Sequence, residues 1–299
     1  MQEKLYSTEP GVQVLVHMHR PSGRARGEIV MVHGLEGSSE AGYIRSMSQL
    51  ALEAGYAVHR TNLRSCGGTE SLCNTMYHAG LTSDTLAILR QIKADFANPI
   101  FLIGYSLGGN VSLKLAGELG ADASDLLSAV AAVSTPIDLG ECVREMSKPQ
   151  NWIYEWRFLA RLKERIRERA KSMPGVYALD TLKNVRSVYE FDDKITAPFF
   201  GFGTAANYYE TQSSIHFLDR IRVPTLMVQA KDDPLIPFEV FNHPAIREND
   251  CIRLLAVEHG GHLGFLASRF PRFWLDRVLL QWIQEQTASM SRLLDRTNG

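Results

Sequence analysis

The sequence predicts an α/β protein built on one mostly parallel sheet whose two faces are covered by helices. Short runs rich in Val, Ile and Leu alternate along the chain with longer amphipathic segments, which is the pattern of parallel strands connected by helices. The run Glu28–His33 is almost continuously apolar, as a strand buried on both faces should be. The chain has 299 residues, of which 45% are hydrophobic and 22% charged, so it has the composition of a globular protein with a sizeable core.

The individual elements follow from apolar periodicity and from the residues that border each run. We expect strands at Val12–His19, Glu28–His33, Tyr56–Asn62, Pro99–Tyr105, Leu127–Ser134, Pro224–Gln229 and Cys251–Val257. We expect helices at Ser39–Glu53, Thr82–Ala94, Leu107–Leu119 and Phe273–Leu294. The second of these helices begins with the capping residues Thr82, Ser83 and Asp84.

The alternation of strands and helices stops between Pro136 and about Phe217. We therefore expect a core formed by residues 1–135 and 218–299, and an insertion of residues 136–217, here called the cap segment. Its one long helix is predicted to bury an apolar face with steps of three and four residues, formed by Trp152, Trp156, Leu159, Leu162, Ile166 and Ala170.

The same helix carries an excess of positive charge between Arg157 and Lys171. Seven basic residues there outnumber Glu164 and Glu168, which gives a local charge of +5. We interpret this run as a solvated helix face supported by ion pairs at helical spacing. The alternative is a docking face for an anionic lipid surface or an acidic substrate.

Charge and cysteine content exclude several classes of protein. Lys and Arg number 32 and Asp and Glu number 33, so a net charge of −1 gives no electrostatic reason to bind nucleic acid. No apolar run reaches the ~18 residues of a transmembrane segment, and the first residues lack the apolar stretch of a signal peptide. The four cysteines follow no metal-ligand spacing. We expect a reduced, cytoplasmic protein without a bound metal.

The most informative motif is Gly104-x-Ser106-x-Gly108, which lies between an expected strand and an expected helix. In that context the glycines allow a sharp turn that projects the serine hydroxyl from the sheet and aims the next backbone N–H, that of Leu107, at a substrate. The start of the helix adds partial positive charge where an oxyanion would form. The alternative is a glycine-rich helix start that merely packs closely on the sheet.

A serine nucleophile needs a histidine base and a carboxylate that orients it. Candidates for both follow the last two expected strands: the acids are Asp232 and Asp233, and the histidines are His259 and His262. We favour Asp233 because a residue before proline is held extended, and we expect Asp232 to cap the following turn. We favour His262 because it follows two glycines, whose flexibility lets a loop carry the ring to Ser106.

The second donor to an oxyanion should come from the loop after an earlier strand. The stretch His33-Gly34-Leu35 follows the strand Glu28–His33 directly, so the backbone N–H groups of Leu35 and Leu107 are expected to form the hole. We interpret His33 as a residue that supports this loop rather than as a catalytic base.

Taken together, these motifs resemble the α/β-hydrolase superfamily, and within it the branch of bacterial YheT-type hydrolases and eukaryotic ABHD1/2/3-like lipases. The resemblance implies an α/β-hydrolase fold with a cap insertion after the sixth strand. It also implies a triad at Ser106, Asp233 and His262, and no metal or organic cofactor. One departure is Ser65, where relatives usually carry glycine. The resemblance rests on residues 33–40, 62–69, 77–80, 104–110, 190–193, 230–234 and 259–265.

The predicted function is hydrolysis of a carboxylic ester, either a small molecule or a lipid, through an acyl-enzyme on Ser106. Thioester cleavage or acyl transfer would use the same triad, and a non-catalytic binding protein on this fold is the alternative from another class. The cap segment is expected to select the substrate, with Trp156 and Phe202 lining the pocket. Its basic helix is the candidate for a weak contact with a membrane surface.

Overall fold

A single twisted sheet organises the computed structural model, which describes residues 1–177, 179–267 and 273–297. The strand order is β1-β2-β4-β3-β5-β6-β7-β8. Strand β2 is antiparallel to both of its neighbours, and the remaining strands pair in parallel. The strands are β1 (Gln2–Glu9), β2 (Val12–His19), β3 (Glu28–Val32), β4 (Ala57–Thr61), β5 (Ile100–Tyr105), β6 (Ala129–Val133), β7 (Thr225–Ala230) and β8 (Ile252–Val257).

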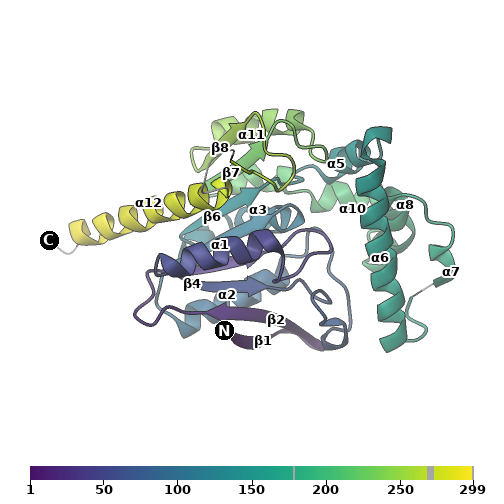
Figure 1. Ribbon diagram of the computed structural model, residues 1–299, viewed down its shortest axis with the longest axis horizontal. Coiled ribbons are helices and arrows are strands. Elements are labelled where there is room, and N and C mark those ends of the chain that lie inside the picture. The colour runs from purple at the N-terminus through teal and green to yellow at the C-terminus, as the bar shows by residue number, and fades with distance from the viewer. Residues whose placement is uncertain (178, 268–272, 298–299) are drawn as a thin grey trace.

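Helices cover both faces of this sheet (Figure 1). Helices α1 and α12 pack on one face, and α2 and α3 pack on the other. Strand β3 shows why both faces must be covered. Ile29 and Met31 belong to the apolar cluster that contains α1 and α12, whereas Val30 and Val32 belong to the cluster that contains α2 and α3. The helices of the core are α1 (Gly42–Glu53), α2 (Ser83–Asp95), α3 (Leu107–Leu119), α4 (Ala123–Leu126), α11 (Pro244–Glu248) and α12 (Trp274–Thr297).

The sequence predicted this α/β architecture correctly, and helix α3 matches its expected bounds to the residue. It did not predict strand β1. Of the eight residues of β1, only Tyr6 is buried, because the strand lies at the edge of the sheet and pairs with β2 alone. A strand with so little apolar burial lacks the pattern on which sequence-based assignment depends.

Between β6 and β7 the chain forms helices and, among the described residues, no strand. The long helix α6 stands at one side of the sheet, with α8 and α10 beside it (Figure 1). The side chains of Leu159, Leu162 and Ile166 join the apolar cluster that contains α2 and α3. The helices of this segment are α5 (Leu139–Met146), α6 (Trp152–Ser172), α7 (Leu179–Leu182), α8 (Val188–Phe191), α9 (Ala197–Phe199) and α10 (Ala205–Gln212).

The prediction that Trp152 and Trp156 belong to the buried face of α6 is wrong. Their exposed fractions are 62% and 66%. Ile153 and Tyr154, on other sides of the same turns, are 55% and 42% exposed, so the start of α6 extends past the elements against which the helix packs. In the described part of the chain no helix is both long and apolar enough to cross a membrane.

Candidate active site

Ser106 lies at the turn where β5 ends and α3 begins. Its φ of 52° and ψ of −122° are values that a residue with a side chain rarely adopts. The turn closes because its neighbours are glycines. A Cβ atom at Gly104 would lie 2.2 Å from the carbonyl oxygen of Gly108, and one at Gly108 would lie 2.4 Å from that of Val32. This is the strand–turn–helix geometry that the Gly-x-Ser-x-Gly spacing predicts.

The ring of His262 connects Ser106 to Asp233. Its Nε2 atom is 2.9 Å from Oγ of Ser106, and its Nδ1 atom is 2.9 Å from Oδ2 of Asp233. A carboxylate can only accept hydrogen bonds, so Nδ1 carries the proton in this pair. The neutral ring then presents Nε2 as the acceptor for the serine hydroxyl.

Asp233 is held rigidly where β7 ends. Its side chain has no exposed surface, and its carboxylate accepts hydrogen bonds from the backbone N–H groups of Leu235 at 2.9 Å and Ile236 at 3.3 Å. The side-chain amide of Gln229 donates a further bond at 3.2 Å. These donors fix the carboxylate under His262, so the ring has one preferred orientation.

The adjacent Asp232 has a different environment. It accepts hydrogen bonds of 2.8 Å from the backbone N–H groups of Gly260 and Gly261, and it lies 3.2 Å from Nδ1 of His259. Of the two acids that the sequence left open, Asp233 is therefore the one in contact with His262. The expectation that Asp232 caps the following turn is wrong, because Asp233 accepts from that turn while Asp232 anchors the loop that carries His262.

The loop after β3 passes directly over the serine. A Cβ atom at Gly34 would lie 3.0 Å from Cβ of Ser106, so only glycine fits at this approach. In the part of the chain that the structure describes, no protein group accepts from the N–H of the next residue, Leu35. The N–H of Leu107 is that of the first helical residue, which has no partner within a helix. Two backbone donors beside Ser106 are thus free for a ligand.

His33 supports this loop from below and does not contact Ser106. Its Nε2 atom accepts a hydrogen bond of 3.0 Å from the N–H of Leu63, so Nδ1 is the protonated nitrogen and donates to the carbonyl oxygen of Gly34 at 2.7 Å. Complete burial lowers the pKa of His33 to about 4, which keeps the ring neutral. This agrees with the interpretation of His33 as a supporting residue.

A cavity of about 110 Å³ opens beside Ser106 and His262, between the core and the cap segment. Its polar wall includes Glu36, Tyr77 and Arg165. The wall also includes the polar side chains of His78, Asp192, Thr196, Tyr208 and Tyr209. Much of its remaining surface is apolar and includes Leu35, Met76, Leu139, Cys142, Val143, Met146, Phe158, Leu162, Val188, Phe191, Leu235 and Ile236. The cavity is suited to an apolar group attached to a polar reacting centre.

The structure corrects the two pocket residues that the sequence suggested. Trp156 is two-thirds exposed and is not part of the cavity wall. Phe202 also does not line the cavity; its ring centroid lies 5.3 Å from that of His78 and 5.2 Å from that of Tyr208, and both of these residues do line it. Phe202 therefore forms a second layer behind the wall. The apolar lining of the cap segment instead comes from α5, from other positions of α6 and from α8.

Comparison with known proteins decides the family. The model of the alpha/beta hydrolase fold family matches residues 28–268, which include Ser106, Asp233 and His262. The chain belongs to this family. Among solved structures, the α/β-hydrolase chain is similar to Est1E from Butyrivibrio proteoclasticus, with a TM-score of 0.63 and 15% identity over 96% of this chain and 100% of that one. That likeness supports the fold alone.

Curated relatives of this α/β-hydrolase have names that refer to esterases and lipases. "Putative esterase YheT" of Escherichia coli (strain K12) is 34% identical over 85% of this chain and 76% of its own length. Phospholipase ABHD3 of Mus musculus is 28% identical over 87% of this chain, and monoacylglycerol lipase ABHD2 of Homo sapiens is 27% identical over 85% of it. The matched region spans 64% of each of these two mammalian proteins.

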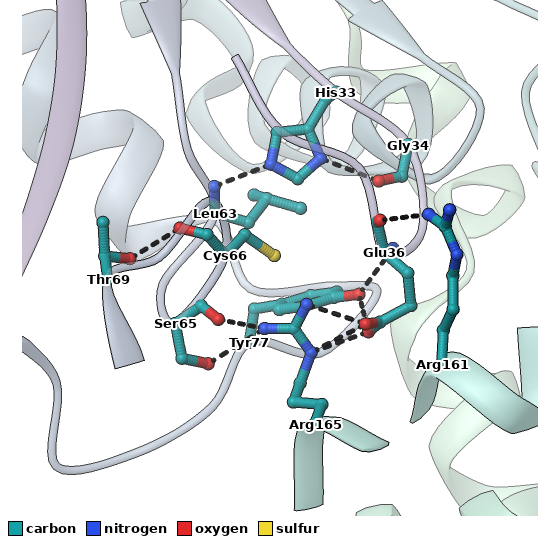
Figure 2. A network of polar contacts seen from close by, with 10 residues as sticks. All are labelled: His33, Gly34, Glu36, Leu63, Ser65, Cys66, Thr69, Tyr77, Arg161 and Arg165. Carbon is teal, nitrogen blue, oxygen red and sulfur yellow. Dashed lines mark hydrogen bonds and ion pairs between the residues drawn. The ribbon is translucent and has the colours of Figure 1, made fainter. Parts of the chain in front are cut away.

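Sequence reasoning missed one cluster of this α/β-hydrolase site, formed by Glu36, Tyr77 and Arg165 (Figure 2). Glu36 and Tyr77 lie in segments that carried the family resemblance, but nothing in their spacing indicated contact. Arg165 is one of seven basic residues in the charged run, and no local signal distinguished it from the others. In the described residues, no group of three or more His, Cys, Asp or Glu side chains is arranged to hold a metal ion.

Proposed function

We propose that this α/β-hydrolase is a serine hydrolase that cleaves carboxylic esters through an acyl-enzyme on Ser106. The observation that carries the proposal is the pair of 2.9 Å contacts that connect Ser106, His262 and Asp233. A buried acid, a histidine oriented by it and a serine on a strained turn form the constellation that activates a hydroxyl nucleophile. The names of the relatives support ester substrates.

In the first half of the proposed reaction, Oγ of Ser106 attacks the ester carbonyl carbon while Nε2 of His262 takes the hydroxyl proton. Asp233 stabilises the imidazolium that forms, because its carboxylate holds the Nδ1 proton. The carbonyl oxygen becomes an oxyanion and receives hydrogen bonds from the N–H groups of Leu35 and Leu107. When the tetrahedral intermediate collapses, the ester C–O bond breaks and His262 returns the proton to the departing alcohol.

In the second half, water replaces the alcohol. His262 takes a proton from this water, whose oxygen attacks the acyl carbon under the same two N–H donors. Collapse of the second intermediate breaks the bond to Ser106, and His262 returns the proton to Oγ. The net products are one carboxylic acid and one alcohol, and the enzyme is regenerated.

The same residues would also support thioester cleavage or acyl transfer to an alcohol, which differ only in donor and acceptor. Labelling with a fluorophosphonate probe tests the proposal, since only an activated serine is phosphonylated. We expect labelling of wild-type protein and none of Ser106→Ala. Comparing p-nitrophenyl esters with acyl-thioesters of equal chain length then separates the two donor classes. Absence of both labelling and turnover would favour a non-catalytic binding protein instead.

We further propose that residues 136–217 act as a cap that selects the acyl chain. The apolar side chains of α5 and α6 in the cavity wall support an uncharged chain of an ester or lipid as the selected group. Arg165, the basic residue of α6 in this wall, is paired with Glu36, so it does not offer a free positive charge to an acidic substrate.

The outer face of α6 supports a weak contact with an anionic membrane surface. Trp152, Ile153 and Trp156 are exposed in the first turns of α6, and the exposed basic residue Arg157 follows Trp156 directly. Tryptophan and basic side chains are the groups that prefer the lipid headgroup region. Binding can be measured by sedimentation with two kinds of vesicle, one of neutral phospholipid alone and one with about 25% anionic phospholipid. The double variant Trp152→Ser, Trp156→Ser should bind the anionic vesicles about tenfold less tightly than the wild type, a loss of about 1.4 kcal/mol in binding free energy.

The control for this measurement is Leu5→Ser, which removes an exposed apolar side chain from β1, away from α6. It should bind like the wild type. Equal binding of the double variant and the wild type, or equal binding to both vesicle types, would contradict a membrane contact at this face.

A further inference from the structure

The peptide bond between Gly34 and Leu35 carries the N–H of Leu35, and it is held in place by hydrogen bonds to the carbonyl group of Gly34. In a planar trans peptide the C=O and N–H groups point in opposite directions. The carbonyl of this peptide belongs to Gly34, and it accepts hydrogen bonds from Nδ1 of His33 at 2.7 Å and from the N–H of Gly37 at 3.0 Å. The direction of the Leu35 N–H is therefore set by His33 and Gly37, which bind the opposite edge of the same peptide.

The residue after Leu35 is held at each of its polar groups. Glu36 has φ of 54°, a left-handed conformation that needs outside support in a residue with a side chain. Its N–H donates to the hydroxyl oxygen of Tyr77 at 3.0 Å, and the same hydroxyl donates to Oε1 of Glu36 at 2.8 Å. Its carbonyl oxygen accepts from Nη1 of Arg161 at 3.3 Å.

The strongest of these contacts comes from the cap segment. Arg165 of α6 lies between the oxyanion loop and the loop of Ser65 (Figure 2). Its Nε atom donates to both carboxylate oxygens of Glu36, at 2.8 and 2.9 Å, and its Nη2 atom donates to Oε2 at 2.7 Å. Nη1 donates to the carbonyl oxygen of Ser65. Only 10% of the Arg165 side chain and 4% of the Glu36 side chain are exposed.

We infer that Arg165 is a positioning residue for the oxyanion hole: it holds Glu36, and through it the N–H of Leu35, in the orientation that stabilises the transition state. This inference rests on the proposed function, because an oxyanion forms only if Ser106 attacks a carbonyl. It adds that the cap segment takes part in the chemistry as well as in substrate choice. The support of the hole thus includes one side chain of α6.

Another arginine of the same helix shows what docking alone looks like. Arg169 is fully buried and donates to the carbonyl oxygens of Glu70 and Cys73, at 2.6 and 2.7 Å. It attaches α6 to the core but makes none of the contacts with Glu36. Arg167, between the two, is exposed. The helix thus supplies a matched set: Arg165 contacts Glu36 and Ser65, Arg169 contacts Glu70 and Cys73 but not Glu36, and Arg167 is exposed to solvent.

The test compares Arg165→Met, Arg165→Lys, Arg167→Met and Arg169→Met at a temperature where all four are folded. With p-nitrophenyl acetate, whose acyl group is too short to need the apolar wall, Arg165→Met should lower kcat about 10- to 100-fold with little change in KM. Affinity for a trifluoromethyl ketone, which forms an oxyanion on Ser106, should fall by a similar factor. Arg165→Lys should recover part of the lost kcat. A lysine keeps the positive charge, but it cannot place two nitrogen donors on the Glu36 carboxylate as the guanidinium does.

Arg167→Met and Arg169→Met should keep kcat within about threefold, although the second should unfold at a lower temperature. Should Arg165→Met fail to fold, Arg165→Lys and Glu36→Gln decide, and both must lower kcat. Equal loss of kcat in Arg165→Met and Arg169→Met, or unchanged kcat in the folded Arg165 variants, would overturn the inference while leaving phosphonate labelling of wild-type Ser106 intact. No labelling of the wild type would overturn the proposed function and this inference together.

Discussion

The strand ends of the core and the cap segment meet at one cavity but contribute to it by different physical means. At the strand ends, backbone constraints dominate: the glycines beside Ser106 allow close approach of main chain to main chain, and Asp233 is fixed by N–H groups only two and three residues away. The cap segment contributes through side chains. Leu162 fills the wall and Arg165 reaches across to Glu36, 129 positions away.

From this difference we expect changes at the strand ends to abolish the reaction and changes in the cap segment to alter the preferred substrate. Groups fixed by local backbone geometry have no substitute when they are removed, because no neighbour can reach the same point. Exchange of an apolar side chain in the cavity wall should change selectivity without abolishing the reaction, although a buried one such as Leu162 also contributes to stability. Arg165 is the exception, since it belongs to the cap segment by sequence and to the oxyanion loop by contact.

The largest effect should come from Ser106→Ala. Removal of the nucleophile should lower kcat for every ester by about 10⁶-fold, because nothing else in the site can form the acyl-enzyme. Steady-state assays on p-nitrophenyl esters measure this, with circular dichroism to verify the fold. Ser112→Ala, on the next turn of α3, is the matched control and should stay within about threefold of the wild type. More than a tenth of the activity remaining in Ser106→Ala would rule out this serine as the nucleophile.

A smaller but still large effect should separate the two adjacent acids. Asp233→Asn removes the acceptor for Nδ1 of His262 and should lower kcat by about 10⁴-fold through the wrong tautomer. Asp232→Asn weakens the contacts with Gly260, Gly261 and His259 but leaves the acceptor for His262 in place, and we expect a loss of about tenfold or less. The two variants are assayed side by side on one ester. The reverse ranking would assign the triad acid to Asp232.

Changes to the cavity wall should alter selectivity without abolishing the reaction. Leu162→Ala enlarges the apolar wall on α6 and should shift the preferred acyl chain to greater length, by about 1–3 kcal/mol of discrimination. Trp156→Ala, on the exposed side of the same helix, should leave the preference unchanged. The measurement is kcat/KM across p-nitrophenyl esters of increasing acyl length, about two to sixteen carbons. An equal fall on all lengths in Leu162→Ala would contradict a selective role for the cap segment.

The smallest expected effect concerns the seam between the two regions. Burial, together with the charges of Lys114 and Arg64, lowers the pKa of His78 to about 3, and its ring packs against Phe200 and Phe202 of the cap segment. Because the pKa in the folded protein lies below the usual ~6.5, the unfolded chain binds the proton first as the pH falls, and the folded state loses stability.

His78→Phe removes this proton site and keeps an aromatic ring in the seam. Between about pH 7 and 5.5, the wild type should lose about 1 kcal/mol of unfolding free energy relative to the variant. Urea unfolding of both proteins at the two pH values measures the difference. Parallel pH dependence in the two proteins would show that His78 is accessible to protons in the folded state.

Much of the fold and of the site was predictable because the relevant signals are local. Apolar runs predicted seven of the strands. The glycines around Ser106 predicted a sharp turn, and the structure explains them: a Cβ atom at Gly104 or Gly108 would lie only 2.2 or 2.4 Å from a backbone oxygen. The order of Ser106, the acids and the histidines along the chain predicted which loops must meet. In each case the decisive property, a buried strand or a backbone approach too close for a side chain, leaves its mark at the residue concerned.

The remaining features depend on partners distant in sequence, and only the tertiary structure decided them. The adjacent Asp232 and Asp233 look alike in sequence. In the fold, Asp232 binds the loop that carries His262, whereas Asp233 contacts the ring of His262 itself. Trp152 and Trp156 follow a helical period that predicts burial, yet the core ends before their turn of α6. Arg165 resembles its basic neighbours until Glu36 pairs with it. A side chain's role here is set by which surface lies opposite it, and spacing along the chain carries no record of that surface.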